Sequence, residues 1–253
     1  MRSNIAIKNK LTLVSQMQGE SCFQILKYPL LKCESNLFKD NKENEKTIKQ
    51  VRIVLDESCV KIEESSLSYI KGYIKKCEDK KIKKGIFGFI NKEKKEFEEL
   101  KDIFEGSGEI LLKPSFDDFT LIELVDEEII ICEEIFQACD DKIEVSLIND
   151  DINKIKLSGS GVVVLKLPVP QEEVIRCKLY KDKLITKDDI VILISSNIKV
   201  AQEKYEKTIE EELVEEVNNV YSGIGEVWIL ATKSIYDEYM KRELFYNEDE
   251  KEY

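Results

Sequence analysis

Short apolar runs alternate with polar clusters along this chain, and one pattern of apolar and glycine positions occurs three times. It is found in "FEGSGEILL" (104–112), "LSGSGVVVL" (157–165) and "YSGIGEVWIL" (221–230). Each copy has two glycines two residues apart, followed by an apolar run. Runs of this length that are rich in β-branched residues are typical of buried strands. The pattern therefore predicts a mainly β protein built from three related units.

The six glycines of these motifs are predicted to be structural. A phosphate-binding glycine loop opens a helix, whereas each motif here leads into a strand sequence. Glycine within a strand pattern marks a bulge or a close approach of another backbone. The residues concerned are Gly106, Gly108, Gly159, Gly161, Gly223 and Gly225.

A longer repeat surrounds the second motif. Residues 125–145 align without a gap with residues 180–200, 55 positions later, and a fainter copy occupies residues 55–67. In each copy an acidic pair separates two apolar runs, which predicts a hairpin of two strands joined by a tight polar turn. The predicted repeat units are about 23–113, 114–168 and 169–233, within one domain at 23–233.

Four segments depart from this pattern. Residues 1–22 are predicted to be an N-terminal extension, and the composition of residues 36–50 favours disorder. Residues 201–219 place Tyr205, Ile209, Leu213 and Val217 four apart, which predicts a short amphipathic surface helix. Residues 234–253 are predicted to be a helical and acidic tail.

Composition and charge exclude several classes of function. The 253 residues have a net charge of -12 and no histidine, which excludes Ser-His-Asp and Cys-His catalysis and imidazole metal ligands. The seven cysteines are scattered with no C-x-x-C spacing, which favours neither a disulfide framework nor a zinc site and indicates a reducing cytoplasm. No stretch of about 18 uncharged residues offers a membrane span, and no cofactor is expected.

One basic segment stands out in this acidic chain. Residues 71–95 contain ten lysines against three acidic residues, around the apolar sequence "GIFGFI". Lysines near an anionic surface attract it, so this loop is a candidate contact for an anionic membrane or an acidic partner. The alternative is that the aromatic residues fold back onto the sheet or fill a subunit interface, while the lysines only solvate the loop. The candidate contact residues are Lys83, Lys84, Ile86, Phe87 and Phe89.

Two further kinds of site, a cation or acid/base site and a nucleic-acid site, are less favoured by the sequence. The acidic pairs Glu63-Glu64, Glu133-Glu134 and Asp188-Asp189 could hold a cation or act as an acid/base pair, but their repeated place favours solvated turns. Nucleic acid is disfavoured by the net charge outside the basic loop. Trp228 is expected in the core, and Cys132 and Cys139 are expected as buried reduced thiols.

The three glycine motifs with predicted hairpins between them, in "FEGSGEILLKPSFDDFTLIEL", "LSGSGVVVLKLPVPQEEVIRCKL" and "YSGIGEVWILATKS", resemble the AIM24 family. The resemblance covers residues 23–233. It implies a fold like that of the trp RNA-binding attenuation protein, a double-stranded β-helix-like sandwich with pseudo-threefold repetition. Family members have a G-G-L-F-G-G loop before the first motif, where this chain has "GIFGF", in which Gly88 is followed by Phe89 and not by a second glycine. The resemblance brings no catalytic residue.

We therefore expect a non-enzymatic, self-associating binding or scaffold protein of the cytoplasm, with peripheral membrane contact through the basic loop. The alternative is a small-ligand binder or an enzyme that uses a pocket inside the β-helix. An apolar pocket with converging carboxylates would favour that alternative.

Overall fold

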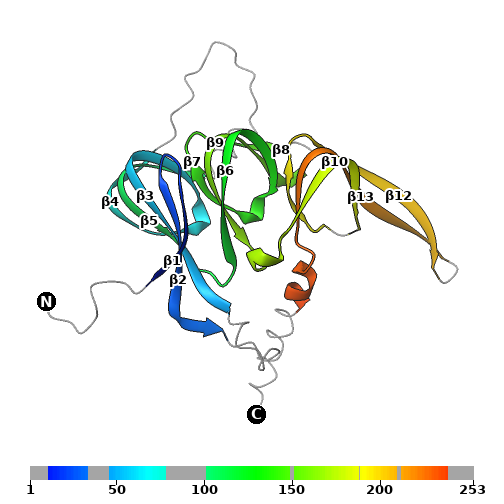
Figure 1. The fold of residues 1–253 in the computed structure, drawn as a ribbon, viewed down its shortest axis with the longest axis horizontal. Coiled ribbons are helices and arrows are strands. Elements are labelled where there is room, and N and C mark those ends of the chain that lie inside the picture. The colour runs from blue at the N-terminus through cyan, green and yellow to red at the C-terminus, as the bar shows by residue number, and fades with distance from the viewer. Residues whose placement is uncertain are drawn as a thin grey trace, which may run out of the picture. The chain divides into compact units, whose positions relative to one another are not determined.

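The fold is mainly β, as the sequence predicts. The computed structural model describes residues 11–33, 46–77, 101–148, 151–187, 189–209 and 212–238. Thirteen strands belong to one hydrogen-bonded sheet network, and residues 233–238 form a short helix. Figure 1 shows the strands in chain order.

The strand bounds follow the predicted apolar runs. The first repeat region contains β1 (Thr12–Gln18), β2 (Cys22–Cys33), β3 (Lys46–Glu63), β4 (Leu67–Cys77) and β5 (Lys101–Leu112). The second contains β6 (Asp118–Cys132), β7 (Phe136–Asp140), β8 (Glu144–Ile148) and β9 (Asp151–Leu167). The third contains β10 (Ile175–Thr186), β11 (Val191–Ser195), β12 (Ile198–Ile209) and β13 (Glu212–Ile229).

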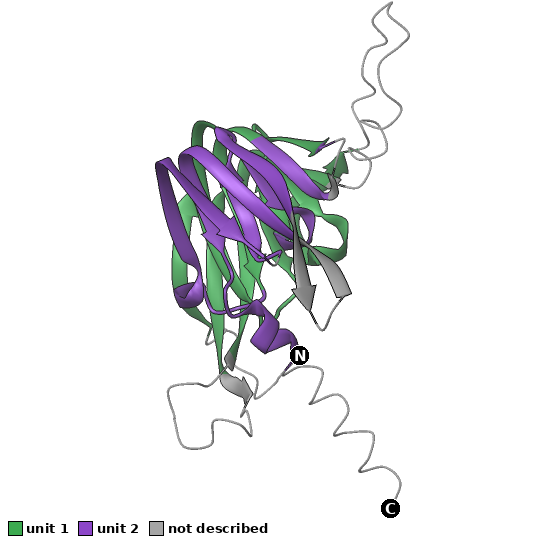
Figure 2. Ribbon diagram, turned by 90° about the vertical axis from the view of Figure 1, so that its right-hand side faces the viewer, with its two compact units in different colours: residues 1–127, 136–147, 158–167 green, residues 128–135, 148–157, 168–253 purple. Residues whose placement is uncertain are grey.

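The chain forms two compact units that do not follow the predicted repeat boundaries. Unit 1 comprises residues 1–127, 136–147 and 158–167, and unit 2 comprises residues 128–135, 148–157 and 168–253 (Figure 2). Strands β6 and β9 each contribute residues to both units.

Unit 1 has its strands in the order β1-β2-β3-β7-β9, with β5 paired to both β3 and β4. Alternate residues of these strands point into one apolar core, because successive side chains of a strand face opposite sides. Its fully buried side chains include Phe23, Val51, Ile53, Val60, Ile62, Ile110, Leu112, Val162 and Val164.

Unit 2 has the order β6-β11-β13-β10, and β12 pairs with β13. Its smaller core is formed by Leu179, Val191, Ile194, Ile198, Tyr221, Val227 and Ile229. The apolar run "VILIS", predicted as a buried strand, is β11, and four of its five residues are buried.

The prediction that the two strands on either side of each acidic pair form a hairpin is wrong. The acidic pairs do sit at turns, since 3-10 turns at Glu64–Ser66 and Glu133–Ile135 join β3 to β4 and β6 to β7. The joined strands, however, do not pair with each other: β3 and β4 both pair with β5, and β7 pairs with β3 and β9. The strand before each turn therefore does not pair with the strand directly after the turn. It pairs with a later strand, the one that contains the glycine motif.

The predicted surface helix at 201–219 is also wrong, because this segment forms the β12–β13 hairpin (Figure 1). The two strands pair in an unbroken register from Ile198↔Gly223 to Ile209↔Glu212. A spacing of four residues is close to one helical turn, but it is also two periods of a strand. Pairing with β13, which is anchored in the sheet on its other side, decides between them.

Segments predicted to lie outside the β domain also join it. Residues 12–18, placed in the N-terminal extension, form β1 and pair with β2. Residues 46–50, for which composition favoured disorder, are the start of β3 and pair with β2. The predicted helical tail begins as the helix at 233–238, and its remainder lies outside the described residues.

Candidate functional site

Each glycine motif lies opposite a bulge in its partner strand. Between Leu55↔Gly108 and Ser58↔Gly106 the register of β3 and β5 shifts, and the bulge residue Glu57 has φ of 52°. The main-chain nitrogen of Glu57 donates to the hydroxyl of Ser107, which lies between the two glycines, at 3.0 Å. The bulge re-aims the strand without leaving this donor unpaired.

The same arrangement recurs at the second glycine motif and in part at the third. Asp126 has φ of 52°, and its nitrogen donates to the hydroxyl of Ser160 at 2.9 Å. Lys181 has φ of 74° and lies in the register shift between β10 and β13. There Ile224 stands between the glycines in place of the serine.

The motif glycines are required by close backbone contact. A Cβ at Gly106 would lie 2.0 Å from the carbonyl oxygen of Tyr73, one at Gly159 would lie 2.6 Å from that of Lys142, and one at Gly223 would lie 2.5 Å from that of Asn197. All three also have positive φ. The glycines thus have a structural role in this fold, and this role explains their presence without a phosphate-binding function.

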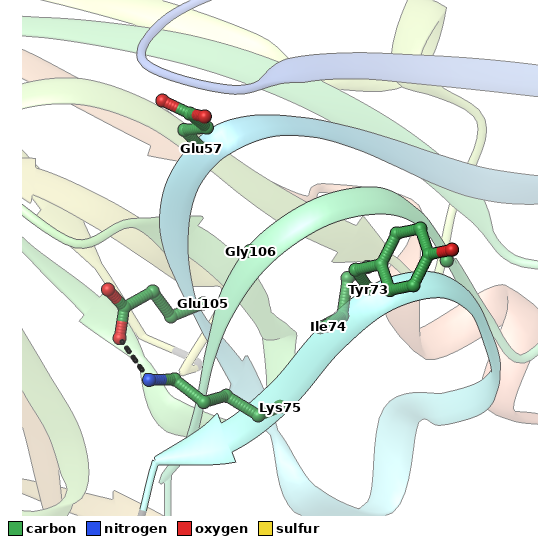
Figure 3. Close-up of a pocket in the computed structure, with 7 residues that line it drawn as sticks. Glu57, Tyr73, Ile74, Lys75, Glu105 and Gly106 are labelled. Carbon is green, nitrogen blue, oxygen red and sulfur yellow. Dashed lines mark ion pairs between the residues drawn. The ribbon is translucent and has the colours of Figure 1, made fainter.

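A shallow hollow lies beside the first bulge (Figure 3). Lys75 points toward Glu105, and their side chains form an ion pair at 3.5 Å, while Tyr73 is 93% exposed. The hollow is lined by Glu57, Gly72, Tyr73, Ile74, Lys75, Glu105 and Gly106. The hollow is open and its lining is partly charged, so it differs from the enclosed apolar pocket that the small-ligand alternative requires.

The carboxylate of Asp140 is fully buried in unit 1. Burial raises the pKa of Asp140, and hydrogen bonds from the main-chain nitrogens of Val162, Ser21 and Glu20 oppose that rise. These bonds hold the turn before β2 against β9, and a Cβ at Gly19 would lie 1.9 Å from the Asp140 carboxylate. Asp140 therefore serves as a structural anchor, since its oxygens are used by the backbone.

Trp228 is buried, as the sequence predicts, but its indole also has polar contacts. Its Nε1 donates to Glu226, and the guanidinium of Arg176 lies 5.1 Å from the ring centroid. The hydrogen bond from Arg176 lowers the pKa of Glu226, against the effect of burial. This cluster fixes β10 to β13 at one end of unit 2.

Six cysteines whose side chains the structure describes are free thiols: Cys22, Cys59, Cys77, Cys132, Cys139 and Cys177. Cys139 is buried, as the sequence predicts, whereas Cys132 is half-buried. Burial, followed by the charge of Asp141, raises the pKa of Cys59 to about 12. Burial, followed by Asp189, raises the pKa of Cys132 to about 11. These two thiols are protonated at neutral pH and are poor nucleophiles.

The predicted contact residues Lys83, Lys84, Ile86, Phe87 and Phe89 lie outside the described residues. The start of the same basic segment, however, belongs to β4, where three lysines pair with carboxylates of β5: Lys71 with Glu109, Lys75 with Glu105 and Lys76 with Asp102. Their charge is therefore partly neutralised within the sheet. Of the acidic pairs, Asp188 is not described, and no group of three His, Cys, Asp or Glu residues suited to a metal occurs in the described parts of the chain.

Four described strands pair with only one neighbour and have exposed apolar side chains: β1, β4, β10 and β12. Strand β4 pairs only with β5, and β10 pairs only with β13, among the described strands. Tyr69 and Ile70 on β4 and Ile185 on β10 are exposed. These residues cannot be recognised from the sequence, because each lies in an ordinary apolar and polar alternation. Only the strand order reveals that they lie at edges.

Comparisons with known proteins extend the description of the fold. The sequence matches no protein-family model and no curated protein. Among solved structures, the X-ray crystal structure of protein SPYM3_0169 from Streptococcus pyogenes is similar, with a TM-score of 0.52 and 12% identity over 87% of this chain and 99% of that chain. At this identity the likeness concerns the fold alone. Among the described residues, no helix has the length and apolar character needed to cross a membrane.

Proposed function

We propose that this chain is a non-enzymatic, AIM24-like binding and scaffold protein that self-associates. The observation that carries the proposal is the pair of open sheet edges at β4 and β10, which expose Tyr69, Ile70 and Ile185. An exposed strand edge is a template for pairing with another chain, and natural proteins usually block such edges with charges, proline or a covering segment. The lysines of β4 are paired with carboxylates of β5, and the apolar side chains on both edges favour pairing with another strand.

The chemistry of the perturbed groups supports a binding role over catalysis. An enzyme needs a nucleophile or an acid/base group matched to neutral pH. The thiols of Cys59 and Cys132 have raised pKa values, and the carboxylate of Asp140 is engaged by main-chain nitrogens. The two thiols are therefore protonated at neutral pH, and the carboxylate is occupied by the backbone.

Light scattering coupled to size-exclusion chromatography tests self-association. The monomer mass is 29.4 kDa, so we expect a discrete multiple of this mass that falls on dilution. A mass of one chain over the whole range, up to the highest soluble concentration, would contradict the proposal.

Peripheral membrane contact through residues 71–95 is a separate part of the proposal and needs its own test. Three of the ten lysines pair with carboxylates of β5, so the attraction depends on the seven others. We expect the protein to float with anionic liposomes and to lose flotation when Phe87 and Phe89 are both changed to Ser. Equal flotation of the two proteins would remove the membrane role and leave self-association untouched.

A further inference from the structure

Two strand pairings inside the chain are equivalent to each other, residue by residue. One joins β3 to β7 within unit 1, with the register Val60↔Asp140, Lys61↔Cys139 and Ile62↔Ala138. The other joins β6 to β11 within unit 2, with the register Ile129↔Ser195, Ile130↔Ile194 and Ile131↔Leu193. Each pairing links the bulged strand of one repeat to a strand of the next repeat.

The hydrogen bonds next to these pairings match as well. The nitrogen of Asp141 donates to the carbonyl oxygen of Cys59 at 3.2 Å, and the nitrogen of Ser196 donates to that of Glu128 at 3.0 Å. Both bonds lie one residue beyond the pairs at the same end of the pairing. The chain therefore uses one interface geometry twice.

The positions of the bulges show which residues of the third repeat correspond to residues 60–62 and 129–131. Val60 and Ile129 each lie three residues after a positive-φ bulge residue, Glu57 and Asp126. The equivalent bulge residue in the third repeat is Lys181. The third bulged strand therefore presents Leu184, Ile185 and Thr186 of β10.

The pairing with the strands that contain the glycine motifs shows which residues of the first repeat correspond to residues 138–140 and 193–195. Strand β7 pairs with β9 at Phe136↔Leu165, shifts register, and resumes at Ala138↔Val164. Strand β11 pairs with β13 in the same way, and β4 pairs with β5 at Leu67↔Leu112, shifts register, and resumes at Tyr69↔Leu111. Tyr69, Ile70 and Lys71 of β4 therefore occupy the place that residues 138–140 and 193–195 hold in the other repeats.

Both edges that would form a third interface are thus present in the chain and have no strand partner among the described residues. We propose that β10 of one copy pairs antiparallel with β4 of a second copy, in the register Leu184↔Lys71, Ile185↔Ile70 and Thr186↔Tyr69. The main-chain nitrogen of Gly72 then donates to the carbonyl oxygen of Lys183, as Asp141 does to Cys59. This inference rests on the proposed self-association and specifies its interface.

The side chains at the two edges fit this pairing. Ile185 is 53% exposed and Ile70 is 36% exposed, and the register places them opposite each other. In the internal interface of unit 2 the same position is also an isoleucine pair, Ile130↔Ile194. Burying such a pair and satisfying an open edge both favour association.

The pairing is head to tail, because each copy offers β10 to one neighbour and β4 to another. An interface of this kind closes into a ring when its rotation allows and otherwise forms an open filament. The fitting partner is a second copy of this chain, because the two edges complete a register that the chain already uses twice.

Charge substitutions at the two edges test the interface. Ile185→Lys and Ile70→Lys should each raise the dissociation constant of the assembly at least about tenfold, because a lysine would be buried against an apolar partner. Ile175→Lys on β10 and Tyr73→Lys on β4 are matched controls, because both residues are exposed apolar positions on the same strands outside the proposed register. Far-UV circular dichroism of each variant confirms that the fold is retained.

Cross-linking of mixed variants tests the register directly. Protein with Ile70→Cys is mixed with protein with Ile185→Cys and treated with a short bis-maleimide, and peptides that join positions 70 and 185 are identified by mass spectrometry. Such peptides can form only between copies, and the unsubstituted protein reports the background from the native thiols. We expect them in the mixture.

The outcomes separate this inference from the proposed function. Association that is unaffected by Ile185→Lys and Ile70→Lys, with no 70–185 peptide, overturns the interface and leaves self-association standing. A 70–185 cross-link that is absent from the mixture but forms in a double variant, with Ile70→Cys and Ile185→Cys in one chain, shows closure within the chain and also overturns it. A protein that remains a monomer at all concentrations overturns both.

Discussion

The carboxylate of Asp140 accepts a hydrogen bond from the main-chain nitrogen of Val162 at 2.8 Å. Its other oxygen accepts one from the nitrogen of Ser21 at 3.1 Å. One fully buried side chain thereby joins the turn before β2 to the strand that follows the second glycine motif. Both oxygens act as acceptors, so each must keep a lone pair for the main-chain nitrogen it faces, which a carboxylate or a carboxylic acid does and an amide nitrogen does not.

Asp140→Asn should therefore destabilise the protein. The amide nitrogen of asparagine would face a main-chain donor and leave it unpaired, at a cost of about 1–3 kcal/mol in the free energy of unfolding. Urea denaturation of the two proteins at pH 7 measures this difference. Equal midpoints would show that the two hydrogen bonds contribute nothing net.

The pH dependence of that difference has a definite sign. Burial raises the pKa of Asp140 in the folded protein, so the folded state holds this proton more tightly than the unfolded state. The contribution of this group to stability is present below the ordinary aspartate pKa and is lost as the pH rises through the folded value. The advantage of the wild type over Asp140→Asn should thus shrink as the pH rises from about 4, and an advantage that grows would contradict the assignment.

Gly106→Ala should be among the most damaging single changes on the surface of unit 1. The new Cβ would lie 2.0 Å from the carbonyl oxygen of Tyr73, at a φ of 142°. Strain and a displaced strand should cost about 2–4 kcal/mol. Gly225→Ala is the control, because the nearest atom there is the Cβ of Ser195 at 2.9 Å and φ is not positive. Thermal denaturation should show the larger loss at Gly106, and the reverse order would contradict the close-contact explanation.

Cys59 and Cys132 should react slowly with alkylating agents in the folded protein. Their pKa values of about 12 and about 11 leave little thiolate at pH 8, so alkylation should be on the order of 100-fold slower than in the urea-unfolded protein. Timed iodoacetamide labelling followed by peptide mass spectrometry measures both sites. Rapid labelling of either cysteine in the folded state would mean that its surroundings do not suppress the thiolate.

Trp228 should report the ionisation of Glu226, because it is the one tryptophan in the sequence and donates to that carboxylate. The hydrogen bond from Arg176 lowers the pKa of Glu226, so the stabilising contact is present above the ordinary glutamate pKa and is lost as the pH falls through the folded value. Arg176→Met should move the acid-induced change in tryptophan emission to higher pH. An unchanged midpoint would show that Arg176 does not control this group.

The acidic pairs show that the local sequence predicts a turn but does not predict which strands pair. Glu64 and Glu133 begin 3-10 turns between strands, as their repeated place between apolar runs indicates. The sequence could not tell that the joined strands pair elsewhere, because a polar turn looks the same whether its flanking strands form a hairpin or separate. The candidate edge at Ile70 and Ile185 was hidden for the same reason, since an edge is defined by the strands that are absent beside it.

The sequence by itself determined the mainly β character, the three glycine motifs and the need for a small residue at Gly106 and its equivalents. These features depend on local alternation and on backbone conformation, which neighbouring residues decide. Only the tertiary structure decided that Tyr205 to Val217 belong to paired strands and that β4 and β10 are left at edges. Those outcomes depend on hydrogen bonds between residues far apart in the chain, and a spacing of four satisfies a helix and a strand equally until the partner strand is in place.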